Sequence, residues 1–257
     1  MYFDTHVHLN SEQYNNIKGI IDNALENKVN KMVVIGYDLE SSIKAIQIAN
    51  NYDFIYAAVG IHPSEIKKMK ENDLEKIESL LKNKKIVAIG EIGLDYYWDK
   101  DNKEEQKEMF VKQLKLANKY NLPIIIHSRE AAQDTYEVLE KNKSYYEKGI
   151  MHCYSYSIDL AKKFINLNLM LAFGGTLTFK NSKQNKEVVK EINIEHLLIE
   201  TDAPYLTPHP FRGKRNEPKY VQFVAKEISE LKNIKEEEVA RITYENACKI
   251  FGIEEWK

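Results

Sequence analysis

Two histidines near the start of the chain have the spacing of metal ligands. His6 and His8 are separated by one residue. Residues 2–9 are predicted to form a strand, in which alternate side chains point to the same face. Asp4, His6 and His8 are therefore expected on one face, where both imidazoles would reach the same metal ion. Such a pair alone is more often structural, so the argument depends on matching residues elsewhere in the chain.

The matching residues come later, each at the end of a short apolar segment. They are His62, Glu91, His127, His152 and Asp202. Each apolar segment is a predicted strand, so these side chains would lie at strand ends. Only two of the seven histidines, His196 and His209, lie elsewhere. Imidazoles and carboxylates are common ligands of divalent metals, so the pattern predicts a metal site.

The set is too large for one ion, because zinc sites normally use three or four protein ligands. The expected ligands are His6, His8, Glu91, His127, His152 and Asp202. Two divalent ions would fit, with the amino-terminal pair and Asp202 on one, the later histidines on the other, and Glu91 as the bridge. Paired ions activate water and stabilise an in-line phosphoryl displacement. Asp202 would also orient the attacking water and accept its proton.

The elements that must position these residues alternate along the whole chain. Strands are predicted at 2–9, 31–36, 54–60, 86–90, 123–126, 149–151, 169–173 and 196–199. Helices are placed at about 10–27, 43–49, 72–82, 103–120, 218–231 and 236–251. Short, continuously apolar strands are typical of a parallel sheet covered by helices. Eight such units predict an α/β protein, a single-domain (β/α)₈ TIM barrel over residues 1–257, with catalytic groups at one mouth. A doubly wound open sheet is the alternative, but its usual glycine-rich phosphate turn is missing.

Composition limits the function classes. The formal net charge is −2, so binding to phosphate backbones must come from a local patch or from metal ions. The two cysteines, Cys153 and Cys248, are far apart, which argues against a disulfide framework and a cysteine-based zinc site. Cys153 is expected to point away from the metals because it neighbours His152. With no apolar run of membrane-spanning length and no leader, a cytoplasmic protein without an obligate protein partner is expected.

Two residues beside the predicted ligands are candidates for contacts with the substrate. His62 would contact the scissile phosphate or a metal-bound water, or else serve as a structural loop histidine. Arg129 follows His127 and would clamp a phosphate through its planar fork, or else form a salt bridge at a helix start. Asp4 and Glu200 would orient ligands through hydrogen bonds, or else serve as buried structural acids.

Two loop segments offer basic or aromatic side chains. Arg212, Lys214 and Arg215, with Phe211, form a small basic patch near Asp202 that suits the phosphates and a stacked base of a nucleic-acid strand. A solvated charged loop is the plainer interpretation. Residues 95–98, which follow the bridging glutamate, would either stack bases or pack the loop.

Taken together, these motifs resemble those of the TatD family of metal-dependent nucleases, within the amidohydrolase superfamily. The matching segments are Asp4-Thr5-His6-Val7-His8-Leu9, Gly60-Ile61-His62-Pro63, Gly90-Glu91-Ile92-Gly93-Leu94-Asp95-Tyr96, Ile126-His127-Ser128-Arg129, His152-Cys153-Tyr154-Ser155, Glu200-Thr201-Asp202-Ala203-Pro204-Tyr205-Leu206, Arg212-Gly213-Lys214-Arg215-Asn216-Glu217-Pro218 and Asn246-Ala247. The resemblance implies a TIM barrel that hydrolyses DNA phosphodiesters, with Mg²⁺ dependence and 3′-exonuclease character. It implies the same six metal ligands. Tyr156 stands where the family often has glycine, and its ring is expected to reshape the mouth beside His152.

Several alternatives stay open at this point. Members of the superfamily hydrolyse other esters, so deacylation of D-aminoacyl-tRNA is the second candidate function. A non-catalytic nucleic-acid-binding barrel and a mononuclear deaminase are further options. The ion is also open, because histidine-rich ligation suits Zn²⁺, Mn²⁺ or iron, whereas Mg²⁺ prefers oxygen ligands.

Overall fold

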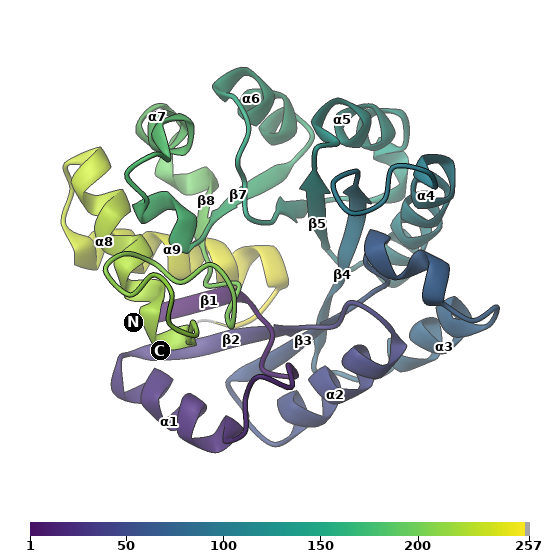
Figure 1. The fold of residues 1–257 in the computed structure, drawn as a ribbon, viewed down its shortest axis with the longest axis horizontal. Coiled ribbons are helices and arrows are strands. Elements are labelled where there is room, and N and C mark those ends of the chain that lie inside the picture. The colour runs from purple at the N-terminus through teal and green to yellow at the C-terminus, as the bar shows by residue number, and fades with distance from the viewer. Residues whose placement is uncertain (255–257) are drawn as a thin grey trace.

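Eight parallel strands form one sheet that curls into a barrel, with helices around it (Figure 1). The structure, a computed structural model, describes residues 1–254. The strands are β1 (Tyr2–Val7), β2 (Val29–Ile35), β3 (Ile55–Val59), β4 (Ile86–Asp95), β5 (Ile124–Arg129), β6 (Gly149–Met151), β7 (Leu169–Phe173) and β8 (Leu197–Ile199). The helices are α1 (Ile17–Glu26), α2 (Leu39–Asn50), α3 (Asp73–Leu80), α4 (Lys103–Tyr120), α5 (Ala132–Lys141), α6 (Ile158–Asn166), α7 (Lys183–Glu191), α8 (Val221–Lys232) and α9 (Glu236–Phe251). The predicted (β/α)₈ barrel is confirmed, and the doubly wound alternative is wrong. Residues 255–257 of the predicted domain lie outside the described residues.

The barrel closes between β1 and β8 at the level of the candidate ligands. A single parallel bridge pairs Val7 with Ala203, just beyond the end of β8. The backbone N–H of Asp202 donates to the carbonyl of His6 at 2.9 Å, and that of His8 donates to the carbonyl of Ala203 at 2.8 Å. Closure of the barrel therefore brings the amino-terminal histidines beside Asp202.

Inside the barrel, side chains from all eight strands pack against α9. This inner core consists of Phe3, Val33, Ile35, Ala58, Val87, Ala88, Ile125, Ile150, Ala172 and Leu198, with Tyr244, Ala247, Cys248, Ile250 and Phe251 from α9. The ring of Phe3, near the start of β1, lies 5.8 Å from that of Phe251 and 5.9 Å from that of Tyr244. Figure 1 shows α9, in yellow, running across the ring of strands. Because α9 closes the end where the strands begin, the opposite mouth is left for a site.

Two strands continue past their apolar runs. β4 was predicted to end at Gly90 but extends to Asp95, since its last residues pair with β5 up to Arg129. Gly93 is paired with His127, has φ +139°, and would place a Cβ only 2.0 Å from the His127 carbonyl oxygen. Only glycine allows the two strands to approach so closely there. Glu91 and His127 are consequently held within strands rather than on loops.

Polar caps set the starts of the first two helices. α1 begins at Ile17 rather than near residue 10, because the side chain of Asn16 accepts a hydrogen bond from the backbone N–H of Gly19 at 3.0 Å. α2 begins at Leu39, before the predicted residue 43, with Asp38 and Ser41 forming a capping box. Within residues 1–254, none of the helices combines the length and the apolar character needed to cross a bilayer.

Candidate metal centre

The residues singled out at strand ends lie together at the open mouth of the barrel. A cavity of about 830 Å³ is lined by His8, His62, Glu91, His127, His152 and Asp202, among others. His6 lies beneath them and is fully buried. The side chains come from segments up to 196 positions apart, and the barrel brings all of them to one place, as the sequence predicted.

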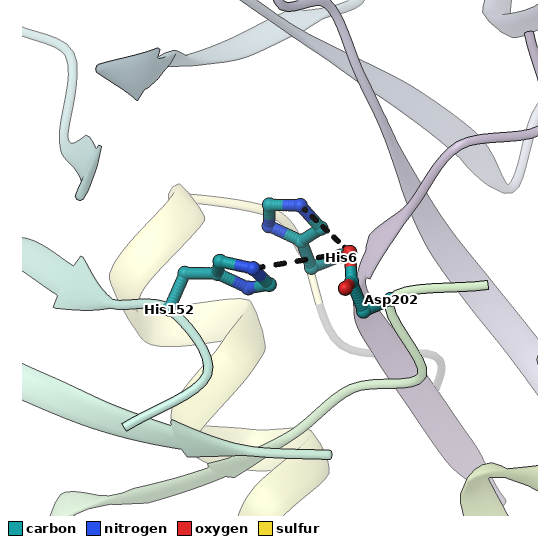
Figure 2. Close-up of side chains that lie close together, drawn as sticks. All are labelled: His6, His152 and Asp202. Atoms are coloured by element: carbon teal, nitrogen blue, oxygen red, sulfur yellow. Dashed lines mark ion pairs between the residues drawn. The ribbon is translucent and has the colours of Figure 1, made fainter. Parts of the chain in front are cut away.

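The first group of side chains surrounds Asp202. Its Oδ1 lies 3.6 Å from the Nε2 of His6, 3.3 Å from that of His8 and 3.8 Å from that of His152. Figure 2 shows His6, His152 and Asp202 pointing toward one another. The Nε2 atoms of His6 and His8 are 3.3 Å apart. Two nitrogens that each bind one tetrahedral ion at ~2.1 Å would be about 3.4 Å apart, so this pair has the spacing of a shared ligand set.

The second group of side chains surrounds Oε1 of Glu91, whereas Oε2 of the same carboxylate faces the first group. The Oε2 of Glu91 lies 3.5 Å from the Nε2 of His6, on the side of the first group. Its Oε1 lies 2.8 Å from the Nδ1 of His127 and 3.8 Å from the Nε2 of His152. The two oxygens of one carboxylate therefore face two different sets of imidazoles. This is the arrangement that a bridging carboxylate requires.

The donor set fits divalent metal ions. Within residues 1–254, five groups of side-chain ligand atoms lie close enough for each to hold an ion, and three of these groups consist only of the predicted ligands. These three are His6 with His8 and Glu91, His6 with His152 and Asp202, and Glu91 with His127 and His152. All of these residues lie within the barrel's mouth, largely screened from solvent, and an uncompensated cluster of this kind is costly to bury. A bound cation would offset that cost.

Electrostatics keep the acids of the cluster ionised. Burial raises the pKa of Glu91, but the nearby imidazoles, led by His62 and His152, bring it well below its usual value. Burial likewise opposes ionisation of Asp202, yet His8, His152 and His6 lower its pKa. The opposite holds for His152: burial lowers its pKa, but the carboxylates of Glu200, Glu91 and Asp202 together raise it to about 10. Without a metal, the cluster holds protons where a metal would supply positive charge.

His62 presents one nitrogen to the cavity in a defined protonation state. The backbone N–H of Ser64 donates to its Nδ1 at 3.1 Å, so the ring's own proton resides on Nε2. That Nε2 lies 3.8 Å from the Oε1 of Glu91. Burial and the neighbouring His127, whose ring centre is 4.3 Å away, lower the pKa of His62 to about 3. His62 is therefore a neutral hydrogen-bond donor at physiological pH.

Asp95 is a site residue that the sequence analysis missed. Its Oδ2 lies 2.9 Å from the Nε2 of His127, and its side chain is 1% exposed. The sequence assigned Asp95 only to a loop that stacks bases or packs. The signal was nonetheless present, because in a β4 that continues past Gly90, Glu91 and Asp95 lie on the same face.

Glu200 orients His152 through the ring nitrogen that faces away from the cluster. Its Oε1 lies 2.9 Å from the Nδ1 of His152 and accepts the backbone N–H of Cys153 at 2.7 Å. This leaves the Nε2 of His152 directed at Glu91 and Asp202. Of the two interpretations of Glu200, the structure favours the orienting role.

Two expectations based on strand alternation are wrong. Cys153 lines the cavity instead of pointing away, because β6 ends at Met151 and Cys153 has φ +47°. Burial raises the pKa of its thiol, which stays protonated. Asp4 does not share the face of His6, since the register of β1 shifts after Asp4. The carboxylate of Asp4 instead accepts the backbone N–H of Thr201 at 2.9 Å, beside Asp202.

The three arginines predicted to bind substrate occupy different settings. Arg129 lines the cavity, and its guanidinium lies 3.8 Å from the ring centre of Tyr97. Arg212 lies over the ring of Phe179, a cavity residue, at 4.2 Å. Arg215 is held away from the cavity lining. It forms an ion pair with Glu217 at 3.6 Å and donates to the carbonyl of Gln13 at 2.8 Å.

Two aromatic residues expected near the substrate pack elsewhere. Phe211 stacks on Tyr220 at 4.7 Å and contacts Phe223 of α8. The hydroxyl of Tyr156 donates to the carbonyl of Ser128 at 2.7 Å, and its ring does not line the described cavity. The hydroxyl thus holds Tyr156 at the strand end that carries His127, and the effect of its ring on the mouth stays a prediction.

Comparison with known proteins identifies the family of this chain. The family described as TatD related DNase matches residues 3–252. The chain belongs to the TatD family. It is 51% identical over 254 residues to the uncharacterized metal-dependent hydrolase YabD of Bacillus subtilis, covering 98% of this chain and all of that protein. The crystal structure of YJJV, a TatD homologue from Escherichia coli, superposes with a TM-score of 0.91 at 30% identity, covering 98% of each chain.

A less similar relative is also named as a metal-dependent hydrolase. The uncharacterized metal-dependent hydrolase YcfH of Escherichia coli is 31% identical over 255 residues, covering 98% of this chain and 96% of that protein. The protein is thus a metal-dependent hydrolase with a TIM-barrel fold. An engineered organophosphorus hydrolase shares the fold alone, at 11% identity and a TM-score of 0.64.

Proposed function

We propose that this TatD-family hydrolase is a DNA phosphodiesterase that uses two divalent ions and removes nucleotides from the 3′ end of single strands. The observation that carries the proposal is the placement of Glu91, whose two oxygens face separate groups of imidazoles. A pair of ions about 3.5–4 Å apart is a common solution for displacement at phosphorus.

The ions would be held by the six side chains of the cluster. The ligand set is His6, His8, Glu91, His127, His152 and Asp202. When bound, Mg²⁺, Mn²⁺ or Zn²⁺ would lower the pKa of a coordinated water and neutralise charge on the phosphate oxygens. The four imidazoles favour Mn²⁺ or Zn²⁺ over Mg²⁺.

Other atoms of the chain would orient the reactants. Asp202 is ionised and lines the cavity, so its carboxylate can hold the attacking water and take its proton. His62 would donate its Nε2–H to a phosphate oxygen, and its lowered pKa keeps it from acting as a cation. Arg129 would bind a neighbouring phosphate. Arg212 and Arg215 would lie along the path of the strand, with Arg215 the weaker contributor because Glu217 already pairs with it.

The test is a metal titration of cleavage on a 3′-labelled single strand. We expect loss of the label from the 3′ end, abolished by chelator and restored by added ions. A His127→Ala variant should lose at least about 100-fold in rate while staying folded, because it removes one ligand. His196→Ala is the matched control, since His196 lies just before β8 begins, at the end of the barrel opposite the mouth.

Two results would contradict the proposal. One is undiminished cleavage by the His127→Ala variant. The other is an inert DNA strand in the presence of every ion, together with turnover of D-aminoacyl-tRNA in a parallel reaction. That second result would show that the same site hydrolyses the carboxylic ester of D-aminoacyl-tRNA and not a DNA phosphodiester.

A further inference from the structure

An unusually exposed aromatic side chain stands in the wall of the cavity. Trp98 is 69% exposed, the highest value among the large hydrophobic side chains of residues 1–254. Its neighbour Tyr97 is 46% exposed. Trp98 lines the same cavity as Glu91 and His127. A large apolar ring left in water at the edge of a polar site is typical of a surface that contacts a ligand.

The turn that carries Trp98 is hydrogen-bonded to Asp95, which contacts the predicted ligand His127. The Oδ1 of Asp95 accepts the backbone N–H groups of Tyr97 and Trp98 at 2.9 and 3.0 Å. The other oxygen of the same carboxylate lies 2.9 Å from His127. The indole is thus held at a set position relative to a predicted ligand, although its ring is free on the solvent side.

A cation accompanies the aromatic pair. The guanidinium of Arg129 lies 3.8 Å from the ring centre of Tyr97 and 5.6 Å from that of Trp98. Within residues 1–254, no carboxylate lies at ion-pair distance from Arg129. Its charge is therefore available to an anion, and Tyr97 keeps its plane fixed. An aromatic ring beside an unpaired arginine matches a base and its phosphate in a single nucleic-acid strand.

We propose that Trp98 stacks on an unpaired nucleobase next to the cleaved phosphodiester, while Arg129 binds the adjoining phosphate. This inference rests on the proposed nuclease function and adds the feature of the substrate that is recognised. In a duplex both faces of an internal base are already stacked, so Trp98 selects ends whose bases are unpaired. Recognition is independent of base identity, because every base has a π-face.

The test compares Trp98→Ala and Trp98→Phe with the unmodified protein on two strands. One strand is normal, and the other has an abasic tetrahydrofuran residue in place of each of its last two nucleosides. On the normal strand Trp98→Ala should raise KM about 5- to 100-fold with little change in kcat, and Trp98→Phe should retain most of the affinity. On the abasic strand the Trp98→Ala and unmodified proteins should have equal KM. Leu25→Ala, at a 40% exposed position on α1, is the matched control and should match the unmodified protein.

Binding separates the failure of this inference from that of the nuclease proposal. With chelator present, the anisotropy of a labelled single strand reports Kd without cleavage. If no strand is cleaved, the nuclease proposal fails, whereas the contribution of Trp98 is still decided by the Kd of the Trp98→Ala variant. Equal affinities of the Trp98→Ala and unmodified proteins for the normal strand would overturn the stacking role. So would an equal loss on the abasic strand.

Discussion

Glu200 shows how much one buried carboxylate can determine in this site. It is fully buried, and its Oε1 lies beside the Nδ1 of His152 at 2.9 Å. Metal-binding histidines usually have a carboxylate or carbonyl at the nitrogen that faces away from the ion. Glu200 occupies that position, so it fixes which nitrogen of His152 is directed at the cluster.

We therefore predict that Glu200→Gln weakens metal binding about 10- to 100-fold. The amide keeps the size of the side chain but removes the charge that holds the Nδ1 proton of His152. Isothermal titration with Mn²⁺ measures the change. Glu195→Gln, at an exposed position, serves as the control. An unchanged Mn²⁺ affinity in the Glu200→Gln variant would show that Glu200 is only a structural acid.

The predicted metal ligands could be identified from the sequence, whereas the residues that orient them were harder to identify. Histidines and acids at the ends of apolar runs stand out because polar groups are rare there. Asp95 did not stand out, since its partner His127 is 32 positions away and only strand pairing brings them together. Cys153 and Asp4 were misplaced because alternation stops where a strand ends or its register shifts.

The position of the last helix, α9, cannot be predicted from the sequence of that helix alone. The sequence predicts α9 with its observed bounds, but not its place across the barrel. Its residues Tyr244 and Phe251 pack on Phe3 and complete the inner core. Bounds follow from local pattern and capping, whereas docking depends on which apolar face the closed sheet leaves uncovered.

This packing leads to a prediction about α9. Phe251→Ala should lower the free energy of unfolding by about 3–5 kcal/mol, because Phe251 is buried and its ring packs on Phe3. Urea denaturation measures the loss. Lys249→Ala, on an exposed position of the same helix, should change it by less than about 0.5 kcal/mol. Metal affinity of the folded fraction should be unchanged in both variants. A small loss for Phe251→Ala would mean that α9 contributes little to the inner core.

For the molecule as a whole, the cluster of predicted metal ligands lies where the barrel closes. The end of β1 meets the segment just beyond β8 through one bridge and two backbone hydrogen bonds near His6, His8 and Asp202. An ion held by side chains from both ends of the sheet would tie the first strand to the last. Since these ligands are scattered in the unfolded chain, binding energy becomes folding energy.

The pH dependence of that stabilisation can be predicted from His152. Nearby carboxylates outweigh burial and raise the pKa of His152 from 6.5 to about 10, so the metal-free protein carries a proton there at neutral pH. In the metal-free protein this proton contributes stability that is fully present below pH 6.5 and is lost as the pH rises toward about 10. An ion must displace the same proton, so its affinity increases over that range. The increase in Tm caused by Mn²⁺ should therefore be larger at about pH 8.5 than at about pH 6.5, with chelator-treated protein as the reference. Equal increases at the two pH values would show that no such proton competes with the ion.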